Sequence, residues 1–120
     1  MHQLRSLMLA AAAATLAAAC ASGPKPEAQM ASSEGAIRGA SEAGAQNVPQ
    51  ATLYIRLAQE QRQTALQMIK DGDNDRARYL LARSEADAEL AIALARQARA
   101  EQDATQANAR VQDLQKQVQP

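Results

Sequence analysis

The sequence predicts an all-α protein, an elongated antiparallel helical hairpin with a long second arm and a short helix before it. Thirty of the 120 residues are Ala, and more than half of the rest are Gln, Glu, Arg, Leu or Lys, the best helix formers after Ala. The two Tyr residues, without Phe or Trp, leave few large side chains for a globular core. No Gly or Pro occurs between residues 73 and 119, which favours one long helix there.

The first nineteen residues are typical of a signal peptide. Arg5 gives a short positive region, and an apolar run extends from Leu7 to Ala19. At about 1.5 Å per residue this run reaches about 20 Å, whereas the hydrocarbon core of a bilayer is about 30 Å thick. We therefore expect residues 1–19 to be removed during export.

The letters LAAAC at the end of that run resemble the lipobox of bacterial lipoproteins. The resemblance implies cleavage between Ala19 and Cys20 and acylation of Cys20, which becomes the first residue of the mature chain. The usual Leu three residues before the Cys is replaced here by Ala17. The resemblance to Gram-negative lipoproteins further implies sorting to the outer membrane, facing the periplasm, because Ala21 and not Asp follows the Cys. The alternative is ordinary secretion with a free thiol at Cys20.

Residues 20–33 are expected to form the lipidated Cys and a flexible tether, because Pro24 and Pro26 stand among small and polar residues without a helical period. Residues 34–46 carry small and apolar residues at spacings of three and four, which predicts a helix with one narrow apolar stripe. The stripe contains Ala36, Ile37, Ala40, Ala43 and Gly44.

The first arm of the hairpin is predicted over residues 49–70. Pro49 suits the first helical turn, Gly72 suits the left-handed position after the helix, and Asp73 can cap the next helix. The predicted apolar stripe is Leu53, Tyr54, Leu57, Ala58, Gln61, Ala65, Met68 and Ile69.

The second arm is predicted to continue to Val118. Its first seam alternates by four and three and is mostly Ala. The members are Ala77, Leu81, Ser84, Ala88, Ala91, Ala95 and Ala98. Counting from the turn, we expect Tyr54 to face Ala91 or Ala95, and Tyr79 to face Ala65 or Leu66. Residues 34–120 would thus form one helical hairpin and coiled-coil domain.

About twenty residues of the second arm extend beyond the first, and the apolar seam shifts in phase there. The shifted seam runs through Ala100, Ala104, Ala107, Val111, Leu114 and Val118. Its spacing is that of a coiled-coil heptad. We expect the last five of these residues to bind a second copy of the chain or a helical protein partner; the alternatives are that the short helix packs there or that the end of the arm frays.

Catalysis and metal binding are not expected. His2, the single His, is removed with the signal peptide, which takes away the usual general base. The acidic run 71–75 resembles the start of a calcium loop, but Arg76 and Ala82 stand where that loop needs Gly and Glu. Glu85, Asp87 and Glu89 are expected on solvated faces. No cofactor other than the covalent lipid, no nucleic acid and no small-molecule substrate is expected, given zero net charge and no phosphate-binding loop.

Two stretches resemble an envelope lipoprotein family known as domain of unknown function 4398. The first is an AGA run followed by Pro, and the second is a Gly-Asp turn followed by an Ala-rich helix. The matching residues are Ala43, Gly44, Ala45, Pro49, Gly72, Asp73, Ala77, Ala86, Asp87, Ala88, Leu90 and Ala91. The resemblance implies a lipid-anchored periplasmic helical module and brings no known activity.

The sequence therefore predicts a lipid-anchored envelope protein that presents a helical hairpin as a structural or adaptor module. A soluble, non-lipidated periplasmic binding or chaperone-like protein is the alternative. The state of Cys20 distinguishes the two.

Overall fold

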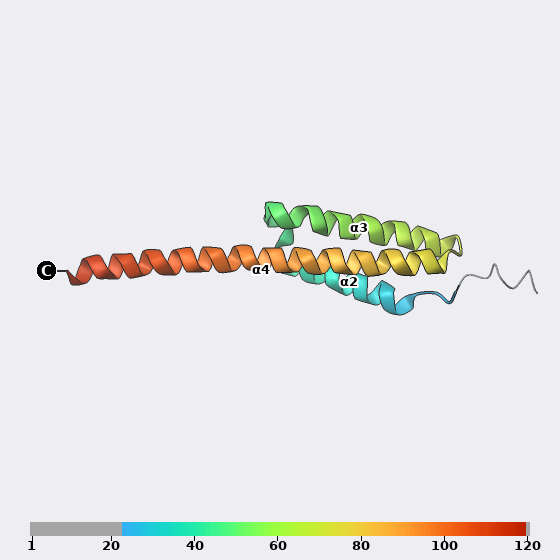
Figure 1. Cartoon of the computed structure of the whole chain (residues 1–120), viewed down its shortest axis with the longest axis horizontal. Coiled ribbons are helices and arrows are strands. Elements are labelled where there is room, and N and C mark those ends of the chain that lie inside the picture. Colours follow the sequence, from blue (N-terminus) through green and yellow to red (C-terminus); the bar gives the residue numbers. More distant parts are fainter. Residues whose placement is uncertain (1–22, 120) are drawn as a thin grey trace, which may run out of the picture.

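The computed structural model describes residues 23–119 and contains helices and no strands over that range. Helix α2 spans Glu27–Glu42, a short 3-10 helix η2 spans Ala45–Asn47, and α3 and α4 span Pro49–Lys70 and Asn74–Val118. Figure 1 shows α3 and α4 as an antiparallel hairpin, with α2 lying alongside α4. The all-α hairpin with a long second arm is confirmed.

Helix α3 begins at Pro49, with Val48 in extended conformation (φ −110°, ψ 113°) before it. Proline restricts the preceding residue to that region and needs no amide partner in the first helical turn. The chain therefore turns sharply between η2 and α3, so that α3 folds back along α2.

The hairpin turn satisfies the exposed ends of both helices. Gly72 has φ +83°, a conformation that costs little only for glycine. Its amide donates to the carbonyl of Ile69 (3.1 Å), and the Asp73 amide donates to that of Met68 (2.9 Å), which completes a Schellman motif. The Asp73 carboxylate then accepts from the Arg76 amide (3.4 Å) and caps α4.

Helix α2 begins seven residues earlier than the predicted helix at residue 34. Residues 27–33, assigned to a flexible tether from sequence, are helical, and Ser33 is fully buried. The Ser33 hydroxyl donates to the Met30 carbonyl one turn back (3.1 Å), which satisfies the buried oxygen inside the helix. Small side chains let this turn pack closely, so packing outweighs the weak helix propensity of Ser.

The same helix ends earlier than predicted, at Glu42 instead of Gln46. Gly44 adopts φ +79°, and its amide donates to the Ser41 carbonyl (3.0 Å). Gly44 is thus the residue that ends the helix, and not a member of its apolar stripe. Ala45 follows and is fully buried.

The core is built mainly from alanine. On α4 the buried residues are Ala77, Leu81, Ser84, Ala88, Ala91 and Ala95, which are the first six members of the predicted first seam. Leu81 is the largest side chain that is fully buried. The buried Ser84 hydroxyl donates to the Ala58 carbonyl of α3 (2.7 Å), so the two backbones approach closely at this point.

The buried stripe of α3 differs from the prediction at its start. Ala51 and Ile55 are buried with Ala58 and Ala65, whereas Leu53 is about half exposed. The predicted stripe included the large Leu53 and left out the small Ala51. Small side chains are buried in this interface because the helices approach closely. Leu53 lies on the side of α3, beside Leu90 of α4.

The two tyrosines have opposite environments. Tyr54 packs against the cluster that contains Ala91 and Ala95, which confirms the predicted position of Tyr54. Tyr79 is 76% exposed, and the prediction that it faces Ala65 or Leu66 is wrong. Leu81, two residues further along α4, packs with Ala65 instead. Two residues turn an α-helix by about 200°, so Tyr79 points away from α3.

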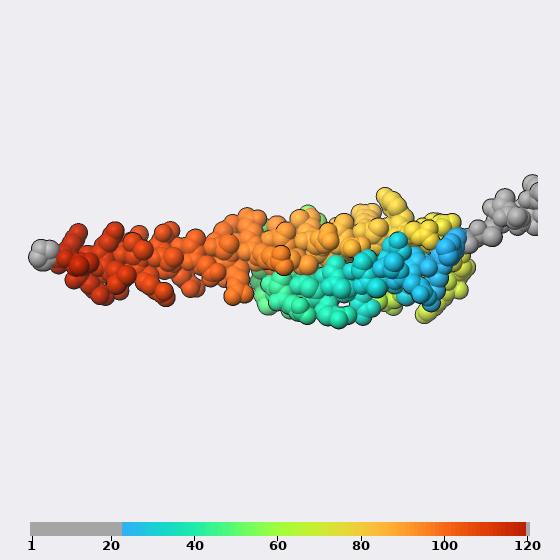
Figure 2. Space-filling model, turned by 90° about the horizontal axis from the view of Figure 1, so that it is seen from below, coloured from blue at the N-terminus to red at the C-terminus, as the bar shows by residue number. Residues whose placement is uncertain are grey.

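The last part of α4 extends beyond the three-helix body. All residues from 99 to 119 are exposed, whereas α2 and α3 lie against the part of α4 before them. Figure 2 shows this extension as a single thin rod next to the thicker body. The short helix therefore does not cover the extension, which leaves the predicted terminal seam open within the described chain.

Candidate interaction surface

The segment before α2 is held against the first turns of α4. The Asn74 side-chain amide donates to the Gly23 carbonyl (2.8 Å), and the Gly23 amide donates to the Asp75 carboxylate (3.3 Å). The Arg78 guanidinium donates to the Pro24 carbonyl (2.9 Å). Pro26 is fully buried. The tether prediction is therefore wrong for residues 23–26 as well, because three side chains of α4 and the burial of Pro26 fix them to the turn end of the body.

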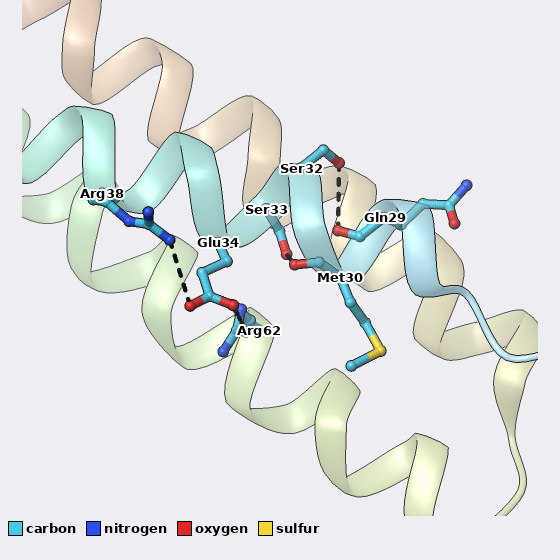
Figure 3. Close-up of polar contacts among 7 residues, drawn as sticks. All are labelled: Gln29, Met30, Ser32, Ser33, Glu34, Arg38 and Arg62. Carbon is cyan, nitrogen blue, oxygen red and sulfur yellow. Dashed lines mark hydrogen bonds and ion pairs between the residues drawn. The ribbon is translucent and has the colours of Figure 1, made fainter.

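A polar cluster joins α2 to α3, as Figure 3 shows. The Glu34 carboxylate accepts from the Arg62 guanidinium (2.8 Å) and lies 3.7 Å from that of Arg38. The Arg62 side chain is only 23% exposed, whereas that of Arg38 is 67% exposed. Partial burial makes the Glu34–Arg62 pair the stronger of the two.

Two of the three carboxylates on α4 that were expected to be solvated contact other helices. Glu85 accepts from the Ser32 hydroxyl of α2 (2.8 Å), and Asp87 accepts from the Gln61 amide of α3 (2.7 Å). Glu89 is exposed. The expectation of solvated faces is therefore wrong for Glu85 and Asp87. Both act as contacts that orient α2 and α3 about α4, and they share no pocket.

The body of the described chain carries several open grooves. One of these grooves has a volume of about 540 Å³ and lies between the start of α2 and the end of α3. Its lining residues are Lys25, Met30, Gln63, Thr64, Leu66, Gln67, Ile69 and Lys70. Over residues 23–119, no three His, Cys, Asp or Glu side chains cluster in a way that could hold a metal ion. Over the same range, no helix has the length and hydropathy of a membrane span.

The exposed seam of α4 is the surface with the clearest apolar pattern. Val111, Leu114 and Val118 are 52%, 54% and 79% exposed, and Ala104 and Ala107 are exposed between them and the body. At about 100° per residue, this seam lies about 140° around α4 from the face that packs in the body. The seam therefore does not lie on the face of α4 that packs against α2 and α3 in the body.

Two further large residues of α4, Tyr79 and Leu90, are exposed on the body. Tyr79 lines a groove with Met68 of α3, and Leu90 lines another with Leu53 of α3. Neither residue lies on the terminal seam, because at about 100° per residue they stand about 60° and about 80° around α4 from the centre of that seam.

The other predicted site residues divide into two groups. Pro49, Gly72 and Asp73 occupy the helix start, the left-handed turn and the cap that the sequence predicts. Ala19, Cys20 and Ala21 lie outside the described residues. The serines of α2, the Glu34–Arg62 pair and the contacts of Asn74 were not predicted, since each joins segments far apart in sequence.

The fold and this surface define a class: small, elongated three-helix proteins with an Ala core and a single-helix extension. Within it, residues 28–107 match the family described as Domain of unknown function (DUF4398), and the chain belongs to that family. No curated protein and no solved structure gives a significant match. Val111, Leu114 and Val118 lie beyond the matched residues.

Proposed function

We propose that this protein is a lipid-anchored, non-catalytic periplasmic envelope protein that presents its helical hairpin, with the exposed end of α4, as a structural or adaptor module at the outer membrane. The observation that carries the proposal is the attachment of residues 23–26 to the first turns of α4. These residues begin three positions after Cys20. An acyl group on Cys20 would therefore hold the turn end of the body close to the bilayer.

The length of α4 then sets the reach of the module. Its 45 residues extend about 68 Å at 1.5 Å per residue. Residues 99–119 occupy the end of α4 opposite the hairpin turn. The exposed apolar seam supports a helix as the partner rather than a small ligand.

The lipid anchor is tested by the mass and location of the protein made in a Gram-negative host. We expect a mature chain that begins at Cys20, carries acyl chains and fractionates with the outer membrane. Cys20→Ser should abolish acylation and release the chain from the membranes, while the matched control Ser22→Ala should behave as the parent. A mature chain with the bare polypeptide mass in the soluble periplasmic fraction would refute the anchor and favour the soluble alternative.

The adaptor role is tested separately, by replacing Val111 and Leu114 with Gln in the full chain. We expect the acylated variant to remain in the membrane and to lose the cross-linked partner that the parent chain captures in intact cells. Gln112→Ala, on another side of the same exposed helix, is the matched control. If the cross-linked products are unchanged, the seam has no part in the function.

A further inference from the structure

The exposed seam has an unequal distribution of side-chain size. Its first three residues, Ala100, Ala104 and Ala107, are small, and its last three are Val111, Leu114 and Val118. All six are exposed in the described chain. A helix that pairs with this seam must therefore place large residues against the first half and small residues against the second.

A second copy in the opposite direction meets this requirement. The twofold axis passes between the helices at the level of residue 109. Ala100 then faces Val118 of the partner subunit, Ala104 faces the partner's Leu114, and Ala107 faces the partner's Val111. Each layer combines one small and one large side chain, and each combines an a with a d heptad position. The distance between the helix axes can then stay constant along the pair, within the 8–10 Å usual for packed helices.

A parallel pair in register would not have this property. It would place Ala against Ala in three layers and Val or Leu against its own copy in the other three. The Ala layers favour a short distance between the helix axes, about 8 Å, and the Val and Leu layers favour a longer one, about 10 Å. One straight pair of helices cannot satisfy both, so cavities would remain beside the Ala layers.

Charge and position also favour the antiparallel arrangement. Residues 99–108 contain Arg99, Glu101 and Asp103, a net negative segment, whereas residues 109–119 contain Arg110, Asp113 and Lys116, a net positive one. Antiparallel pairing brings segments of opposite sign side by side. It also aligns residue 99 with the partner's residue 119, so that the pair uses the exposed residues 99–119 and stays clear of both three-helix bodies.

We propose that residues 99–119 of two copies form an antiparallel coiled coil centred on Ala109. The proposal rests on the adaptor part of the proposed function, for which it names the partner, and does not depend on the acylation of Cys20. The two bodies would lie at opposite ends, and the residues at position 74 of the two copies would be about 105 Å apart along the axis, from a rise of 1.5 Å per residue. Because the overlap is short, the pairing should be reversible and concentration-dependent.

Disulfide trapping tests the direction and register. Full chains carrying Ala107→Cys or Val111→Cys, one of them with an epitope tag, are co-expressed and oxidised in intact cells. The antiparallel pair predicts that the mixed 107–111 product exceeds the 107–107 and 111–111 products about tenfold. The parent chain contains only Cys20, so any disulfide-linked product that it gives measures the background from Cys20. Dominant 107–107 and 111–111 products, or no product above the parent, would overturn the proposal.

A size exchange tests the layers themselves in purified full-length protein. Leu114→Ala and Ala104→Leu should each weaken dimer formation at least fivefold in sedimentation, because one leaves Ala against Ala and the other places Leu against Leu. The double variant restores one small and one large residue in that layer and should recover dimer formation. Neither position contacts the body, so helix content and unfolding of the body should not change.

The outcome is distinguishable from failure of the proposed function. If both single variants and the double variant sediment as the parent does, the coiled coil is refuted, whatever the state of Cys20. Loss of acylation with an intact mixed disulfide would refute the anchor and leave the coiled coil in place.

Discussion

The Asn74 side chain donates a 2.8 Å hydrogen bond to the Gly23 carbonyl across 51 positions of sequence. This contact, with that between Arg78 and Pro24, joins the segment after Cys20 to the beginning of the longest helix. It converts a segment that the sequence presents as a tether into part of the body. Residues 23–26, which begin three positions after Cys20 in the sequence, are therefore fixed at the turn end of the body.

Removal of the Arg78 contact should loosen this segment without unfolding the body. For Arg78→Ala we expect faster amide exchange at residues 23–30 and a loss of about 0.5–1.5 kcal/mol of local stability, the usual contribution of one hydrogen bond. Hydrogen exchange with mass spectrometry measures both. Arg83→Ala, an exposed position on the same helix, should leave the exchange of residues 23–30 unchanged. Equal exchange in both variants would contradict the attachment.

Leu81 should be the most sensitive position of the core. Leu81→Ala removes the largest fully buried side chain from a core that is otherwise mostly Ala, and such a change costs about 2–5 kcal/mol. We expect a large drop in the thermal midpoint by circular dichroism, or loss of cooperative unfolding. Leu53→Ala, at a half-exposed site, should cost less than about 1 kcal/mol. A similar loss in the two variants would show that the core has been assigned incorrectly.

Substitution by Ala should have opposite effects on the free energy of unfolding at two glycines, Gly35 and Gly72, that have open space around them. No atom would meet a Cβ at Gly35 or at Gly72 within 4 Å. Gly35→Ala should raise the free energy of unfolding by about 0.5–1 kcal/mol, because Gly35 lies inside α2. Gly72→Ala should lower it by about 1–2 kcal/mol, because φ is +83° there. Denaturant unfolding gives both values, and a gain at Gly72 would refute the left-handed turn.

The ion pair between Glu34 and Arg62 should exceed that between Glu34 and Arg38. A double-mutant cycle with Glu34→Gln and Arg62→Gln should give a coupling of about 0.5–1 kcal/mol, because the Arg62 side chain is only 23% exposed. The cycle with Arg38→Gln should give less than about 0.3 kcal/mol, since both partners are well exposed. The first coupling should decrease as salt is added. Equal couplings would mean that burial does not strengthen the Arg62 pair.

The helices that depend on local signals could be predicted from the sequence. Pro49 marks the start of α3, and Gly72 with Asp73 marks the turn, because each residue type has a strong backbone preference at its position. The spacing of Ala and Leu in the first half of α4 gives its buried face for the same local reason. Family membership was also apparent from these stretches.

The start of α2 and the contacts of residues 23–26 could not be predicted in this way. Ser32 and Ser33 have weak helix propensity, and the helix through them is stabilised by packing and by bonds to α4 such as that with Glu85. The wrong environment predicted for Tyr79 has a related cause, because the register between α3 and α4 is set by close Ala packing and not by the largest side chains.

The helical class, the hairpin turn and the two seams of α4 can be predicted from the sequence alone, because they follow from backbone preferences and from spacing along one helix. The inclusion of residues 23–33 in the body, the exposure of Leu53 and Tyr79, and the uncovered end of α4 are visible only once the helices are packed together. These features depend on which faces of different helices meet, and in an Ala-rich chain many faces resemble one another until close packing selects among them.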